Sequence, residues 1–276
     1  LGWLRKYRVE RVGIEASCGY EQVVVSHLRR NGLVVIVFQP AQVRAYAKFH
    51  LQRAKNDKID AALIAVCTAA APKIHAPPDP RLAPFAEHLT LIEQTTEDIA
   101  CFKTRRESCR DQRIRGVWKQ EIGRLKGLLR SELKQLVAAI RQYPDLAERL
   151  ELIASVDGVG LRTAVAILVR MPEIGRVTRE QAAALVGLAP YDDDSGDQVG
   201  VRHIAGGRER LRKSLYSATL AAAFHWNAQL IAIYERLIAA GKSHKVALVA
   251  CARMLLIFVN TVVARGTPWT PKPATI

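Results

Sequence analysis

Three carboxylates in this sequence have the types and spacing that could carry out chemistry on a phosphodiester. Asp57 and Asp60 stand at positions i and i+3 of a predicted helix, so both side chains project from one helix face. Glu15 ends the first predicted strand, at the sheet edge where α/β proteins place functional groups. Carboxylate oxygens are ligands that Mg²⁺ prefers. We therefore expect a Mg²⁺ site that could activate an oxygen nucleophile.

Ser195 is a candidate nucleophile in a polar loop, next to Gly196. A serine hydroxyl can attack phosphorus when it is accessible and cations neutralise the developing charge. The cations that follow it, and that could also contact nucleic-acid phosphates, are Arg202, Arg208, Arg210, Arg212 and Lys213, with His203 among them. Three aspartates, residues 192–194, directly precede the serine. They would repel an approaching phosphate unless a metal ion or an arginine offsets them.

Each of these residues also has an ordinary structural role open to it. A serine in a polar loop is commonly a turn residue, and His203 could be a plain surface histidine. Asp57 could cap its helix, and Asp60 could pair with Lys55 or Lys58 on the surface. Spacing alone does not choose between these roles and catalysis.

A second candidate contact with nucleic acid is the glycine turn DGVG at residues 157–160, which separates two apolar helical segments. Gly158 and Gly160 stand at the amino end of the second helix, where exposed backbone N–H groups can hold a phosphate. This pattern is typical of a helix-hairpin-helix. A tight turn between packed helices, without a ligand, would give the same pattern.

The elements that must position these residues begin with an α/β segment. The pattern predicts strands at residues 9–16 and 33–38, with a helix at 22–30 between them, and further helices at 40–54 and 56–71. Two strands are few for a parallel sheet that needs both faces covered. We therefore expect this domain to be incomplete on its amino-terminal side, and the start at Leu1 instead of Met agrees with that.

The rest of the chain is predicted to be helical. Five prolines between residues 72 and 84 indicate a linker, and apolar residues at a spacing of about 3.5 then predict two long helices in an antiparallel hairpin. Between Lys103 and Arg141 the sequence has twelve basic residues and four acidic ones, so we expect the exposed face of the hairpin to be positive. It could be a solvated face, a nucleic-acid contact or a dimer contact. From residue 150 onward the chain is helical with short loops, apart from the polar stretch 190–207.

Charge and composition narrow the class of protein. The 276 residues suffice for one large or two ordinary domains, and 41 Lys and Arg against 26 Asp and Glu give a net charge of +15. That surplus points to a polyanionic partner. Five cysteines without a C-x-x-C pair predict neither a disulfide framework nor a zinc site, which fits a reducing cytoplasm. The apolar stretch 246–264 contains Arg253 and Asn260 and suits a buried helix better than a membrane span.

Five motifs occur together in one order: IEASCGY at residues 14–20, KNDKIDA at 55–61, DGVG at 157–160 with Thr163 and Ala164, GLAP at 187–190 with Ser195 and Gly196, and GGR at 206–208 with LR at 211–212 and LY at 215–216. In this arrangement the chain closely resembles the DEDD transposases of insertion sequences related to the Piv invertase, the group known for guidance by a bridge RNA. The resemblance extends over nearly the whole chain.

The resemblance implies four regions: an incomplete RuvC-like, RNase H-type domain at residues 1–75, a proline-rich linker at 76–84, a coiled-coil hairpin at 85–145 and a helical transposase domain at 146–276. It implies that Glu15, Asp57 and Asp60 match the second, third and fourth acidic Mg²⁺ ligands, and that Ser195 matches the serine that forms a covalent phosphoserine with DNA. It also implies a homodimer or tetramer with DNA and guide RNA as partners, cytoplasmic and nucleoid-associated in a bacterium or archaeon, without a membrane.

The first acidic residue of the family should precede Leu1, and this chain lacks that segment. Two other hypotheses therefore stay open beside a serine transposase. One is a RuvC-like nuclease that cleaves with metal-activated water and leaves no serine adduct. The other is a truncated, inactive remnant that still binds nucleic acid.

Overall fold

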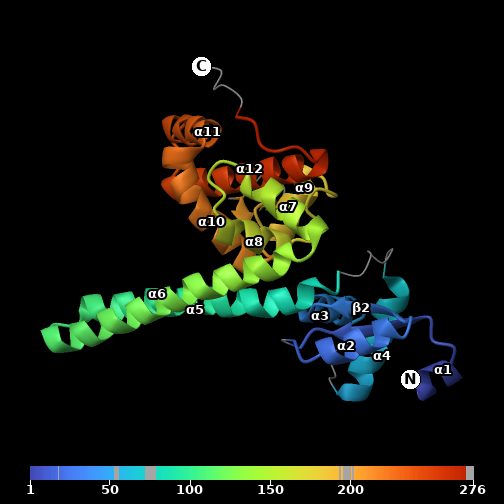
Figure 1. Ribbon diagram of the computed structural model, residues 1–276. Coiled ribbons are helices and arrows are strands. Elements are labelled where there is room, and N and C mark those ends of the chain that lie inside the picture. Colours follow the sequence, from blue (N-terminus) through green and yellow to red (C-terminus); the bar gives the residue numbers. More distant parts are fainter. Residues whose placement is uncertain are drawn as a thin grey trace. The chain divides into compact units, whose positions relative to one another are not determined.

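The computed structural model describes residues 1–17, 19–52, 56–71, 79–192, 194, 200 and 202–271. The chain divides into two compact units, Leu1–Pro77 and Pro78–Ile276 (Figure 1). The division falls within the stretch that was expected to be a linker. Each unit has its own buried side chains.

The first unit contains a two-stranded parallel sheet. Strands β1 (Arg11–Glu15) and β2 (Val34–Phe38) pair in register from Arg11 opposite Val34 to Glu15 opposite Phe38. Helix α2 (Gln22–Arg30) connects them, and a short helix α1 (Gly2–Lys6) precedes β1. The predicted β-α-β order is confirmed, and Glu15 does end its strand.

Two further helices complete this unit. Helix α3 (Pro40–Phe49) is shorter than predicted, because the chain leaves helical geometry at His50 and Leu51 has a positive φ of 55°. Helix α4 (Asp57–Ala70) begins where the pattern placed it. Few apolar side chains are buried in this unit, and they form two small clusters: Val25, Leu28 and Val35, and Phe38, Val43 and Cys67.

The second unit begins with a helical hairpin, as predicted. Helices α5 (Leu82–Ser108) and α6 (Gln112–Arg141) lie side by side in Figure 1 and are joined by three residues. Contacts between the helices, such as Phe102 stacked on Trp118 and His88 paired with Glu132, show that they run antiparallel. Asp111 caps α6 by accepting a hydrogen bond from the Ile114 N–H at 3.0 Å.

The other helices of this unit pack around one continuous core. They are α7 (Pro144–Ala154), α8 (Leu161–Arg170), α9 (Arg179–Val186), α10 (Glu209–Ala221), the π-helical turn η1 (Ala222–Trp226), α11 (Ala228–Ala239) and α12 (His244–Arg265). Residues near the base of the hairpin, such as Leu89 and Ile140, belong to the same core as α8 and α12. The hairpin is therefore anchored in the helical core.

A small antiparallel ribbon interrupts the helices. Strands β3 (Pro190–Tyr191) and β4 (His203–Ile204) pair Pro190 with Ile204 and Tyr191 with His203. The sequence predicted only a polar loop here, because two-residue strands are too short to give a periodic pattern. The ribbon brings the two ends of residues 192–202 together.

Helix α12 is long and apolar enough to cross a membrane by length and composition. More than half of its most apolar window is buried inside the protein, and Leu255, Leu256 and Val259 are fully buried in the core. Its Asn260 is satisfied there, since the side chain accepts a hydrogen bond from the Gly175 N–H and donates one to the Val177 carbonyl. These contacts agree with the prediction of a buried helix.

Candidate functional site

Glu15 lies at the carboxyl end of β1 with its side chain half-buried. It follows Gly13 by two residues, so both belong to the same face of the sheet. That face is covered by α4, because a Cβ at Gly13 would collide with side-chain atoms of Thr68 and Ile64. The glycine thus allows α4 to pack directly on β1, and Glu15 stands on the face that this helix covers.

Asp57 and Asp60 occupy the first turn of α4. The helix is capped by Asn56, whose side chain accepts a hydrogen bond from the Ile59 N–H at 2.9 Å. Asp57 is therefore not the cap that its position allowed. Neither aspartate makes an ion pair with any residue that the structure describes. The surface pairing with Lys58 is absent; Lys55 lies outside the described residues.

The three carboxylates supply hard oxygen donors of the kind that Mg²⁺ binds. Within the described part of the chain, however, no three acidic, histidine or cysteine side chains come together as a metal-binding group. Glu15, Asp57 and Asp60 therefore have the ligand type that Mg²⁺ binds, but their side chains are not close enough together to form a metal site by themselves.

Glu21 is a buried carboxylate that the sequence analysis missed. One of its oxygens, Oε2, accepts hydrogen bonds from the Ser17 N–H at 2.9 Å, the Gly19 N–H at 3.0 Å and the Ser17 hydroxyl at 3.2 Å. The pKa of Glu21 is lowered to about 2, chiefly because the Ser17 N–H donates to its carboxylate. The anion holds the turn that follows Glu15. Its hydrogen-bond donors lie two and four residues before it in the chain. Such a short spacing occurs by chance in many sequences, so it did not identify Glu21 as a special residue.

The candidate nucleophile Ser195 lies outside the described residues, and so does Asp193. What the structure describes is the support on either side of Ser195. The β3–β4 ribbon closes the loop, and Gly207, just beyond the ribbon, packs against the backbone of Gly187, just before it. A Cβ at Gly207 would collide with the backbone of Gly187 and Val186. Two positive-φ glycines, with φ of 69° and 77°, thus fasten the two arms of the loop together.

Arg212 strengthens the same junction. Its guanidinium donates hydrogen bonds to the carbonyl oxygens of Val186, at 3.1 Å, and Gly206. Arg208 beside it forms a two-bond ion pair with Glu173 at 2.6 and 2.8 Å. Both were predicted to bind nucleic acid, and the structure gives each of them contacts that position the base of the loop.

Arg202 pairs with the acidic residues next to the candidate serine. Its guanidinium contacts Asp192 and lies 3.4 Å from an Oδ2 of Asp194. Asp194 also accepts a hydrogen bond from the Gly200 N–H at 2.9 Å. The sequence left open how a phosphate could approach past these aspartates, and Arg202 offsets two of them.

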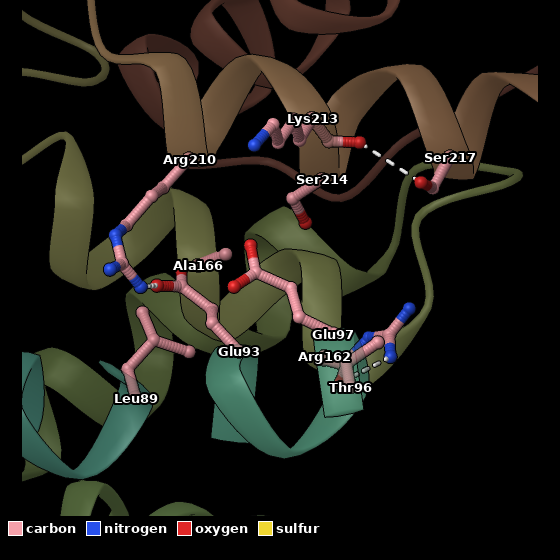
Figure 2. A pocket seen from close by; sticks show the side chains of 10 residues that line it. All are labelled: Leu89, Glu93, Thr96, Glu97, Arg162, Ala166, Arg210, Lys213, Ser214 and Ser217. Carbon is pink, nitrogen blue, oxygen red and sulfur yellow. Dashed lines mark hydrogen bonds and ion pairs between the residues drawn. The ribbon is translucent and has the colours of Figure 1, made fainter. Parts of the chain in front are cut away.

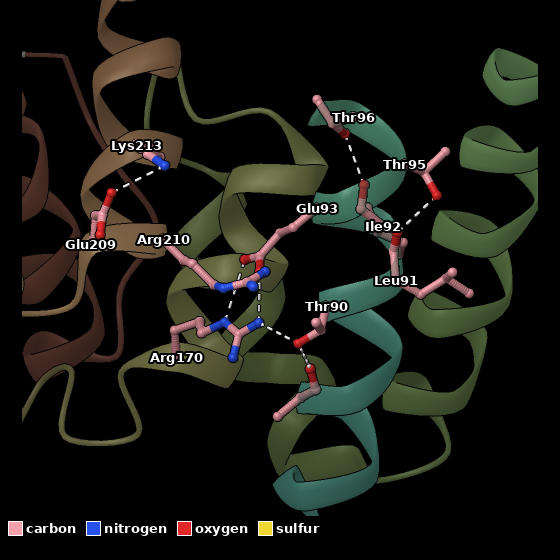
Figure 3. Close-up of polar contacts among 11 residues, drawn as sticks. Thr90, Leu91, Ile92, Glu93, Thr95, Thr96, Arg170, Glu209, Arg210 and Lys213 are labelled. Carbon is pink, nitrogen blue, oxygen red and sulfur yellow. Dashed lines mark hydrogen bonds and ion pairs between the residues drawn. The ribbon is translucent and has the colours of Figure 1, made fainter. Parts of the chain in front are cut away.

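Arg210 and Lys213 of α10, also predicted to bind phosphate, are exposed, with 42% and 63% of their side chains accessible. Each has an intramolecular partner: Arg210 pairs with Glu93 at 3.0 Å, and Lys213 with Glu209 at 3.1 Å (Figure 3). Glu209 is exposed as well, so that pair is weak in water. Both cations could still contact a phosphate.

Glu93 is the centre of an ion-pair network that links three helices. Its carboxylate lies 2.7 Å from Arg170 of α8 and 3.0 Å from Arg210 of α10, and Arg170 also donates to the Thr90 hydroxyl at 2.9 Å (Figure 3). Glu93 and Arg170 are largely buried, so the pairing is screened less than on the surface. The network fixes the hairpin helix α5 against the helices that support the loop. Local sequence patterns could not predict this network, because the partners are 77 and 117 positions apart.

A pocket lies beside this network, between α5, α8 and α10. Figure 2 shows Ser214 and Lys213 on one side of it and Glu97 and Arg162 on the other, with Arg162 donating to the Thr96 hydroxyl at 3.3 Å. Charges of both signs line it. This mixture does not favour a phosphate over a cation.

Gly158 and Gly160 of the DGVG turn differ in role. Gly158 has a φ of 92°, and a Cβ there would collide with Ala222 of η1. Gly160 is the N-cap of α8, is exposed and has nothing near the position of its missing Cβ. Gly158 is thus needed for helix packing, whereas Gly160 leaves the helix N-terminus open to a ligand.

Two family models match the chain. A DEDD transposase model of the IS110 type matches residues 1–109, which contain the three carboxylates. A second model, described as Transposase IS116/IS110/IS902 family, matches residues 150–235, which contain the serine loop and its arginines. The chain therefore belongs to the IS110/IS116/IS902 family of transposases, with a DEDD domain followed by a helical domain.

Two curated relatives resemble the chain over most of its length. They are the pilin gene-inverting proteins of Moraxella bovis and Moraxella lacunata, each 26% identical over 267 residues. The alignment covers 93% of this chain and 80% of each relative. The resemblance deduced from the five motifs is confirmed.

Proposed function

We propose that this transposase moves DNA by serine transesterification, with Ser195 as the nucleophile. The observation that best supports this proposal is how firmly the base of the serine loop is held. A β-ribbon, a contact between two glycines and the hydrogen bonds of Arg212 hold it there. These contacts fix the two described arms from which Ser195 is held, and Arg202 offsets the charge of Asp192 and Asp194.

In the proposed reaction the Ser195 hydroxyl oxygen attacks a DNA phosphorus. A phosphoserine bond forms, the bond from phosphorus to one strand oxygen breaks, and the serine proton is balanced by protonation of the leaving strand oxygen. A second strand hydroxyl then attacks the phosphoserine and releases the serine. Because one phosphodiester replaces another, the exchange needs neither water nor an external energy source.

We further propose that Glu15, Asp57 and Asp60 belong to a Mg²⁺ site of the DEDD domain. Mg²⁺ bound there would polarise a phosphoryl oxygen as a Lewis acid. Two observations support the assignment: neither aspartate has a cationic partner among the described residues, and Asn56 takes the cap role. The RuvC-like character of this unit is part of the same proposal.

The partners follow from family and charge. We propose that the protein works on DNA in the cytoplasm of a prokaryotic cell, guided by RNA, as a dimer or tetramer in which the basic coiled-coil hairpin contributes to assembly. The net charge of +15 supports extensive phosphate contacts. The exposed cations Arg202, Arg210 and Lys213, with the Gly160 turn, are candidates for some of them.

The nucleophile is tested by Ser195→Ala in the full-length protein with donor DNA and guide RNA. We expect the covalent protein–DNA adduct, seen as a shifted band under denaturing conditions, to disappear. Ser214→Ala, a serine on α10, should leave the adduct intact. An undiminished adduct in Ser195→Ala would refute the assignment. Cleaved DNA with free ends and no adduct in the unmodified protein would favour a metal-dependent nuclease instead.

The metal site is tested by Asp57→Ala and Asp60→Ala. Both should lose Mg²⁺-dependent strand cleavage, and calorimetric titration with Mg²⁺ should show weaker binding whether or not the protein is active. Asp98→Ala, which removes an exposed carboxylate from α5, is the control. Normal cleavage and unchanged Mg²⁺ binding in both variants would make the two aspartates ordinary surface residues.

A further inference from the structure

A cluster of aromatic rings is exposed where η1, α11 and α12 meet. Phe224 contacts Tyr234 edge-on with ring centroids 4.9 Å apart and stacks beside His244 at 6.2 Å. The Tyr234 hydroxyl and His244 Nδ1 are hydrogen-bonded at 2.7 Å. Phe224 is 41% exposed, and Trp226 in the same turn is 68% exposed. The fold thus fixes the rings and leaves aromatic surface in water.

The π-helical turn explains why the rings point outward. The Asn227 N–H bonds to the Ala222 carbonyl, five residues earlier, at 3.0 Å. Ala222 and Ala223 are buried, with Ala222 against Gly158 of the DGVG turn. The buried Asn227 caps α11 and donates to the Asp157 carbonyl at 3.1 Å. Small residues therefore take the inner side of the turn, and such turns are frequent at functional sites.

The chain around the rings is strongly basic. From Ala222, where η1 begins, to Arg265, where α12 ends, there are five Lys and Arg and a single acidic residue, Glu235. Lys245 directly follows His244 and Lys242 precedes it by two residues; both are exposed, and neither forms an ion pair with a described residue. An apolar protein partner would gain nothing from these charges. A polyanion that carries flat, apolar rings matches both the charges and the aromatic surface.

We propose that Phe224, Tyr234 and His244 form a stacking platform for an unpaired base of single-stranded DNA, with Lys242 and Lys245 on the neighbouring phosphates. Strand exchange separates base pairs, so unpaired bases arise during the reaction. Duplex DNA does not offer its base faces, so the platform distinguishes separated from paired strands. The inference rests on the proposed action on DNA, but it does not depend on Ser195 or on the metal site.

The test compares Phe224→Ala with Phe49→Ala, which removes an exposed phenylalanine from the first unit. Binding of the full chain to fluorescent single-stranded DNA, single-stranded RNA and duplex DNA is measured by anisotropy. We expect Phe224→Ala to weaken single-stranded DNA binding about tenfold and to leave duplex binding within about twofold, with no effect of Phe49→Ala. Lys245→Ala should reduce the slope of the logarithm of the binding constant against the logarithm of the salt concentration by about one.

A second variant guards against loss of folding. Phe224→Leu keeps apolar volume in the contact with Tyr234 but has no aromatic face, and it should also weaken single-stranded DNA binding. Unchanged binding in both variants, an equal loss for duplex DNA, a loss confined to RNA, or a change of oligomeric state would each overturn the proposal. Adduct formation by Ser195 is measured separately, so failure of the platform and failure of the nucleophile give different results.

Discussion

The two units support their candidate chemistry in different ways. In the first, the carboxylates stand on a two-stranded sheet and the helix packed on it, and the buried apolar side chains form only two small clusters. In the second, the serine loop stands on an even smaller ribbon, but the ribbon is fastened to a continuous helical core. A short strand pair can therefore be a firm support if what lies beneath it is well packed.

A close glycine contact holds each site, and the two contacts differ in kind. Gly13 of β1 faces the side chains of Thr68 and Ile64, which can rotate. Gly207 faces the backbone of Gly187 and Val186, which has little freedom to move. The same substitution at the two glycines should therefore have unequal effects.

Gly207→Ala should have the largest effect. The new Cβ meets backbone, and the φ of 69° is strained for alanine, so we expect a loss of about 3 kcal/mol in unfolding free energy. The control is Gly206→Ala, with a φ of 63° but open space around it, which should cost only about 1 kcal/mol. Denaturant unfolding of both variants measures the difference. Equal losses of unfolding free energy would show that backbone strain at the positive φ, and not the contact with Gly187, causes the destabilisation.

Gly13→Ala should have a smaller effect, confined to the first unit. Thr68 and Ile64 must shift to admit the new methyl group, which should cost about 2 kcal/mol. Hydrogen exchange should rise in β1 and α4, with the helical core unchanged. Gly2→Ala, which meets no atom within 4 Å, serves as the control. Faster exchange throughout the second unit would mean that the two units unfold together.

Glu21→Gln should have the smallest effect, visible in the pH dependence of stability. Because the pKa of Glu21 is about 2 in the folded protein and 4.5 is the ordinary value, its carboxylate stabilises the fold above about pH 4.5. That contribution is lost as the pH falls towards 2. The variant should therefore lose less stability than the unmodified protein between these values. Acid unfolding followed by circular dichroism measures this, with the exposed Glu10→Gln as control; identical acid transitions would contradict the assignment.

Much of the fold follows from the sequence because it depends on local patterns. The period of apolar residues placed α2, β2 and α4 to within a residue or two, and both long helices of the hairpin. Local patterns failed where geometry changes over one or two residues. Helix α3 ends early at the positive φ of Leu51, and the strands β3 and β4 have two residues each.

For the site, the sequence by itself determined the candidate residues, the surplus of positive charge and the family, since residue types, net charge and motif order need no coordinates. Only the tertiary structure decided which side chains are free and which are engaged. Asn56 and not Asp57 caps α4, Arg202 offsets the aspartates, and Arg208 and Arg212 hold the loop. The physical reason is distance along the chain. The contacts of Arg208 and Arg212 join residues 35 and 26 positions apart. The partner of an exposed cation or carboxylate is whichever group folding brings within hydrogen-bonding distance.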